Sequence, residues 1–173
     1  MNIEQEILKE HSKKQAMKIA LYACSSKKNF KELMHCFMMG EYRLSQRAAW
    51  SVSWAARTKP EMIQPYIKDL VAQLPRKDVH PSVIRNSVRI LETLTIPENL
   101  QGEVMNECFS FIENPATPVA IKAFSLTTLY HLGNTYPEIL PELKLIIEER
   151  WDTETAAFRS RGKKILQAIA KPI

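Results

Sequence analysis

Two tryptophans flanked by arginines form the pattern in this chain that is best suited to molecular recognition. Arg43, Arg47, Trp50, Trp54 and Arg57 follow one another at spacings of 4, 3, 4 and 3 residues, which places them on one face of a single helix. An indole beside a guanidinium group suits stacking on a nucleic-acid base or anchoring a peptide. The alternative interpretation is structural: the tryptophans fill a gap between neighbouring units, and the arginines extend over them.

Further basic residues occupy a matching flank of the later helices. If those helices stack side by side, their basic residues would align as a ladder that continues the one begun by Arg47. The remaining candidate binding residues are Arg89, Lys122 and Lys164.

The net charge is also distributed unevenly along the chain. Residues 1–90 contain 16 Lys and Arg against 8 Asp and Glu, whereas residues 91–173 contain 8 against 11. A basic first half would attract phosphate groups or acidic protein surfaces. The alternative is that these charges only keep the surface solvated.

No catalytic or metal-binding motif occurs in the sequence. There is no phosphate-binding loop and no G-x-S-x-G turn. Cys24, Cys36 and Cys108 lie in apolar helical patterns without a C-x-x-C pair, and the four histidines are scattered. We therefore expect reduced, buried thiols, no metal, no cofactor and no enzymatic activity.

A recurring dipeptide shows how the chain is organised. Pro60-Glu61, Pro97-Glu98 and Pro137-Glu138 are separated by 37 and 40 residues, and each opens an apolar helical run. A period near this length is typical of stacked helix pairs. The second helix of each pair carries a small residue in its apolar stripe, where we expect another helix to cross closely. These small residues are Ala48, Ser87, Ala123 and Gly162.

The length fits one cooperative domain without disulfides or metal. We predict a capping helix within residues 1–27, followed by units at about 28–59, 60–96, 97–136 and 137–173. The charged first residues and the lack of a long apolar stretch predict neither a secretory leader nor a membrane span. A cytoplasmic monomer that does not bind membranes is the resulting expectation.

The segments PEMIQPYIKDLVAQL and PEILPELKLII resemble the first helices of HEAT-like repeats of the armadillo superfamily. In that family an acidic residue in the turn between helices pairs with a basic residue early in the second helix. The matching pairs here are Glu41 with Arg47, Asp78 with Arg85 and Asp152 with Arg159, whereas the third unit departs from the pattern with Asn114 and Lys122. The resemblance implies an all-α fold, a right-handed α-α superhelix (solenoid) of about four helix pairs.

Two functions are compatible with these observations. The first is a noncatalytic interaction module that binds a protein or peptide on the concave face formed by second helices. The second is nucleic-acid binding through the basic ladder, because HEAT-like DNA glycosylases use a basic concave face with Trp and Asp near the lesion. Trp151-Asp152-Thr153 is similar to a fragment of such a site.

Overall fold

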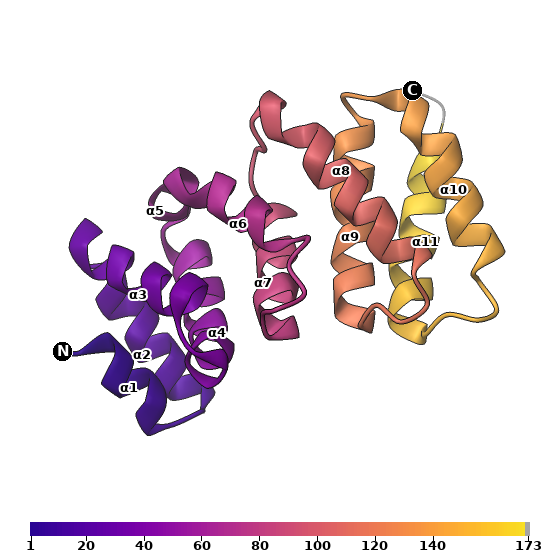
Figure 1. Ribbon diagram of the computed structural model, residues 1–173. Helices are drawn as coiled ribbons and strands as arrows, with labels where there is room; N and C mark the ends of the chain where they lie inside the picture. The colour runs from indigo at the N-terminus through magenta and orange to yellow at the C-terminus, as the bar shows by residue number, and fades with distance from the viewer. Residues whose placement is uncertain (172–173) are drawn as a thin grey trace. The chain divides into compact units, whose positions relative to one another are not determined.

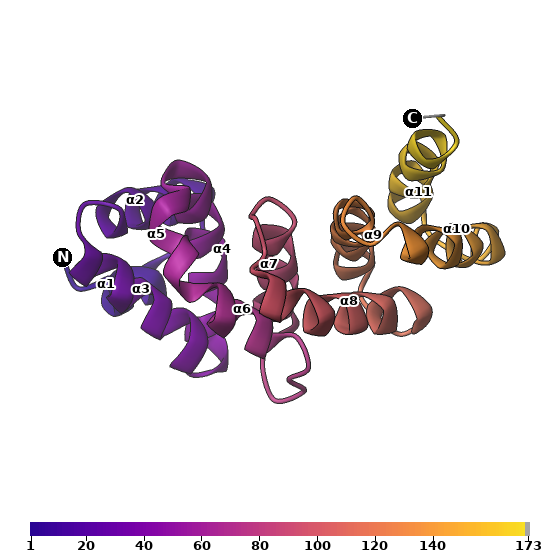
Figure 2. The ribbon, with the colours of Figure 1, turned by 90° about the horizontal axis from the view of Figure 1, so that it is seen from above.

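The computed structural model describes residues 1–171, and the regular structure in these residues consists of helices without any strand. The chain divides into two compact units, Met1–Leu94 and Thr95–Ile173. Antiparallel helix pairs form each unit (Figures 1 and 2). The prediction of an all-α repeat fold is therefore confirmed.

In the first unit the long helix α4 is the central element. It packs against α2, α3 and α7, and its apolar stripe of Ala48, Val52 and Ala55 is completely buried. The helices of this unit are α1 (Ile3–Lys9), α2 (Lys13–Ala23), α3 (Lys27–Met39), α4 (Tyr42–Thr58), α5 (Pro60–Ile63), α6 (Ile67–Gln73) and α7 (Pro81–Leu91), with a 3₁₀ segment η1 (Gln64–Tyr66).

The N-terminal segment differs from the single capping helix that we expected. It contains two helices, α1 and α2, and each begins with a capping side chain. Asn2 accepts a hydrogen bond from the Gln5 amide, and Ser12 accepts one from the Gln15 amide. Such caps satisfy backbone donors at a helix start, so the chain can begin a second helix after only three intervening residues.

Prolines shape the first helices of the repeats. Pro60 opens α5, but Pro65 lacks the amide needed for a continuous helix, so the run passes through η1 before α6 begins. Pro137 likewise opens a 3₁₀ segment, η2 (Pro137–Ile139), and Pro97 is the N-cap of an uninterrupted helix. The recurring Pro-Glu dipeptide therefore marks each start, while the helix that follows differs.

In the described part of the second unit, residues 95–171, there are four α-helices besides η2. The buried helix α9 lies side by side with α8 and also packs against α11, and α10 packs against both α9 and α11 (Figure 1). The bounds are α8 (Glu98–Glu113), α9 (Val119–Gly133), α10 (Leu140–Glu149) and α11 (Ala156–Ile169).

The recurring small residues lie on buried faces of their helices. All four are buried, and Ala48 and Ser87 are completely inaccessible to solvent. At Gly162 the reason is visible, since a Cβ atom there would lie 2.8 Å from Ile147 Cγ2 on α10. The predicted close approach of helices is confirmed at Gly162, whereas at Ala48, Ser87 and Ala123 the structure shows burial and the close crossing stays a prediction.

Candidate functional site

Trp54 lies at the centre of a group of cations in the first unit. The Arg57 guanidinium lies over its indole ring, 4.2 Å from the ring centroid, and the Lys13 ammonium lies 5.5 Å from it. Lys13 is the first residue of α2, so two second helices contribute to this arrangement. Cations over an indole face are attracted by the negative charge of its π system.

Arg89 on α7 adds a third cation from a third helix. Burial lowers the pKa of the Arg57 guanidinium, and the positive charge of Arg89 lowers it further. The two guanidinium groups are therefore near enough for the charge of Arg89 to act on Arg57, which itself lies over the Trp54 ring. We call Lys13, Trp54, Arg57 and Arg89 the Trp54 cluster.

The Trp54 side chain is half-buried, and its indole N–H is shielded from solvent. Within residues 1–171 this N–H has no hydrogen-bond acceptor. A buried donor without a partner costs stability, so the position gains nothing from the indole nitrogen in the free protein. The exposed part of the side chain is its apolar ring surface.

Trp50 and Arg47 have structural roles. The Trp50 ring lies 5.5 Å from the ring of His11, between the α1–α2 connection and α4. Arg47 Nη1 donates a hydrogen bond of 2.7 Å to the carbonyl oxygen of Leu8 at the end of α1. For these two residues a packing role therefore fits the contacts better than a free binding surface does, although they pack against the N-terminal segment and not between the first two repeats.

Arg43 lies at the other end of α4, away from the Trp54 cluster. Its side chain is exposed and lines a cavity of about 530 Å³ together with Cys36 and Met39 of α3. The five residues that share one face in the sequence are thus divided in the structure. Arg57 and Trp54 belong to one cluster, Trp50 and Arg47 to the N-terminal packing, and Arg43 to a separate hollow.

Lys122 is not part of an exposed basic ladder, and its assignment as a binding residue is wrong. The side chain is 5% exposed, and its ammonium lies 2.7 Å from the Glu154 carboxylate. It also donates a hydrogen bond of 3.3 Å to the carbonyl oxygen of Pro115. A buried ion pair leaves this amine no surface on which to meet a ligand.

Lys164 on α11 is exposed, as a binding residue must be. It belongs to the second unit, whereas the Trp54 cluster belongs to the first. The neighbouring Arg161 is engaged within that unit, since its Nη1 donates to Thr127 Oγ1. Whether Lys164 takes part in binding stays a prediction.

The acidic–basic pairs suggested by the family resemblance have other partners. Asp78 forms its ion pair with Arg76 at 2.6 Å, and Arg159 donates to the carbonyl oxygen of Glu154 rather than to a carboxylate. Asp152 is exposed, so the acidic residue held in the last turn between helices is Glu154. Its basic partner Lys122 comes from the second helix of the preceding pair.

Comparison with known families now settles the class of this repeat. A model of the HEAT repeat domain matches residues 3–169. The chain belongs to the HEAT repeat family. A search of the curated proteins and a search of the solved structures each found no match. HEAT repeats generally serve as noncatalytic scaffolds for protein interactions.

The three cysteines of this HEAT repeat protein are buried. Burial raises the pKa of the Cys36 thiol to about 11 and that of the Cys108 thiol to about 12, and it also raises the pKa of Cys24. The prediction of buried cysteines is confirmed. Among residues 1–171 no group of three His, Cys, Asp or Glu could hold a metal ion, and no helix there is long and apolar enough to cross a membrane.

Sequence reasoning missed Lys13 as a member of the Trp54 cluster. The residue lies in the segment that we expected to be a single capping helix. Because the chain breaks between α1 and α2, Lys13 begins α2 instead. The Ser12 cap signal could have located the start of α2, but no sequence pattern gives the distance from Lys13 to Trp54.

Proposed function

We propose that the protein is a noncatalytic interaction module that binds an acidic segment of a partner protein through the Trp54 cluster. The observation that carries this proposal is the position of the Lys13 and Arg57 cations over one partly exposed indole, with the charge of Arg89 acting on Arg57. An acidic side chain can neutralise the crowded cations, while an apolar side chain of the same segment packs on the ring. The scaffold function of HEAT repeats supports a protein as the partner.

The charge of the first unit supports an anionic ligand. Residues 1–94 contain 16 Lys and Arg against 9 Asp and Glu, a net charge of +7. An excess of this size attracts an acidic segment before contact is made and makes its association rate dependent on salt. The second unit, with 8 against 10, offers no such attraction.

Nucleic-acid binding is the second candidate, and one observation favours it. Two cations over an indole also suit a nucleotide, whose base can stack and whose phosphate can pair. The glycosylase variant of this candidate has less support. Trp151 and Asp152 belong to the second unit, and the tryptophans of α4 belong to the first.

Fluorescence anisotropy with two labelled ligands of equal net charge tests the proposal. One ligand is an acidic peptide with a central phenylalanine, and the other is a single-stranded oligonucleotide. We expect the peptide to bind more tightly at physiological salt. Tighter binding of the oligonucleotide, with log affinity falling linearly against log salt, would establish the second candidate instead.

Lys13→Ala and Lys68→Ala form a matched pair for this experiment. Both lysines are exposed on helices of the first unit, but Lys68 lies on α6 and outside the Trp54 cluster. We expect only Lys13→Ala to weaken peptide binding. Trp54→Phe should also weaken it and still fold, because it removes an indole N–H that has no acceptor within residues 1–171. Failure of both ligands to bind at low salt would reject an anion-binding role for this cluster.

A further inference from the structure

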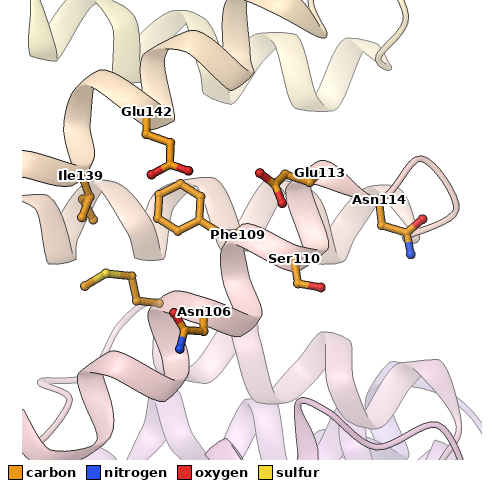
Figure 3. A pocket seen from close by; sticks show the side chains of 8 residues that line it. Asn106, Phe109, Ser110, Glu113, Asn114, Ile139 and Glu142 are labelled. Carbon is orange, nitrogen blue, oxygen red and sulfur yellow. The ribbon is translucent and has the colours of Figure 1, made fainter.

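A pocket in the second unit is lined by acidic and apolar side chains, whereas the Trp54 cluster is basic. It has a volume of about 580 Å³ and lies where α8 faces η2 and the start of α10. Met105, Phe109 and Ile139 provide its apolar lining. Figure 3 shows the carboxylates of Glu113 and Glu142 beside the Phe109 ring, one from each side of the pocket. The pocket therefore joins one aromatic ring to two acidic groups.

The helix α8 builds this pocket with two parallel rows of side chains. Met105, Phe109 and Glu113 are each four residues apart, so they lie one above another on the helix surface, and Asn106 and Ser110 form the adjacent row. One row changes from apolar to acidic along the helix. The other offers hydrogen-bonding groups beside it, so the pocket has an ordered polarity along its length.

Neither carboxylate is neutralised within the part of the chain that the structure describes. No ion pair or side-chain hydrogen bond there involves the carboxylate of Glu113 or Glu142. Arg150 reaches the backbone carbonyl of Glu113 with Nη1 at 2.8 Å. The Arg150 charge is paired with Glu154, because Nε and Nη2 of Arg150 lie 3.0 and 2.9 Å from the Glu154 carboxylate.

We propose that this pocket binds an arginine side chain of an extended segment in a partner protein. The guanidinium plane stacks on Phe109, and its N–H groups reach the carboxylates of Glu113 and Glu142. Arginine fits better than lysine because it is planar, weakly hydrated and able to bond two carboxylates in different directions. The volume lies in the range of ligand pockets and leaves room for backbone next to the arginine, which Asn106 and Ser110 can bond.

This site is independent of the proposed function. It belongs to the other unit, is formed by first helices and selects a ligand of opposite charge. An acidic peptide that binds the Trp54 cluster would be repelled here. Failure of one site therefore leaves the other unaffected, and each has its own ligand and its own variants.

The test is a titration of the full chain, labelled at methionine and isoleucine methyl groups, with short capped peptides followed by nuclear magnetic resonance. One peptide contains arginine, a second contains citrulline, which has the same shape without the charge, and a third contains lysine. We expect the arginine peptide to shift the Met105 and Ile139 signals and to bind about tenfold more tightly than the citrulline peptide, as a ring contact and two carboxylate contacts together allow. The signals of Met17 and Met39 in the other unit should not move.

Variants identify the groups responsible. Glu113→Gln combined with Glu142→Gln should abolish the preference for arginine over citrulline. Glu149→Gln, an exposed change on the same helix α10 outside the pocket, should leave it intact. Phe109→Leu keeps an apolar side chain but removes the ring, and it should reduce binding of the arginine peptide. Equal binding of arginine and citrulline peptides, or of arginine and lysine peptides, would overturn the proposal, as would a double variant that binds normally.

Discussion

The ammonium of Lys122 and the carboxylate of Glu154 lie 2.7 Å apart, and both side chains are 5% exposed. Lys122 belongs to α9, and Glu154 lies in the turn before α11, so the pair joins consecutive second helices of the second unit. Arg150 contacts the same carboxylate at 2.9 Å. Lys122 and Arg150 therefore share one buried carboxylate. We expect the buried Lys122 ammonium to need this carboxylate more than the carboxylate needs Lys122.

Removing Glu154 should destabilise the protein more than removing Lys122. Glu154→Ala leaves the buried Lys122 ammonium with only the Pro115 carbonyl, and a buried charge without its counterion costs about 3–5 kcal/mol. Lys122→Met leaves Glu154 paired with Arg150, so its cost should be smaller. Urea denaturation of both variants measures the difference. Equal costs, or a larger cost for Lys122→Met, would show that Arg150 does not neutralise the carboxylate.

Glu6 on α1 should titrate far below a free glutamate. Its hydrogen bonds to Lys18 and Gln15 lower its pKa from 4.5 to about 2. A carboxyl group with a lowered pKa in the folded state stabilises that state above pH 4.5, and the contribution is lost as the pH falls toward 2. Carbon-13 titration of the side chain should show this pKa directly. Lys18→Met should raise it toward 4.5, and no change in that variant would contradict the assigned cause.

The fold was predictable because its signals are local. Helical periodicity, Pro-Glu starts and small crossing residues each depend on side chains within a few turns, and all recur at the expected places. The break at Pro65 was not predicted, although a proline inside a helical run lacks the amide that a continuous helix needs. The site was less predictable. Helical spacing places Arg47 and Arg57 on one face, but their separate roles depend on contacts with α1 and α7, which are distant in sequence.

Lys122 also shows that helical register does not determine the role of a basic residue. Its register on the second helix matched that of the other basic residues, and only the position of Glu154, 32 residues later, makes it a buried partner rather than a surface cation. Charge type and helical register cannot decide between these outcomes, because a lysine is tolerated in either environment when its charge is paired.

Ser87 should tolerate a smaller side chain and reject a larger one. It is completely buried, and within residues 1–171 its hydroxyl has no hydrogen-bond partner. Ser87→Leu should cost roughly 1–3 kcal/mol through overpacking, although leucine favours helices more than serine does. Ser87→Ala should be neutral or stabilising, because it removes an unsatisfied hydroxyl. Thermal melting of both variants checks this, and an unchanged melting temperature for the leucine variant would disprove a close helix crossing at Ser87.

Cooperative unfolding of the whole chain is a prediction that the three tryptophans can test. Trp50 and Trp54 lie in the first unit and Trp151 in the second, so each unit has its own fluorescent reporter. Neighbouring repeats stabilise one another across shared interfaces, and a chain of this length should therefore unfold in one transition. We expect a Trp151→Phe variant, which reports only on the first unit, and a Trp50→Phe/Trp54→Phe variant, which reports only on the second, to show the same midpoint in urea by fluorescence. Circular dichroism of each variant provides the control, because it follows all helices at once and corrects for any stability lost through the substitution. Two fluorescence midpoints that differ by more than the shifts seen in dichroism would mean that Met1–Leu94 and Thr95–Ile173 unfold separately, so the chain would be two domains rather than one.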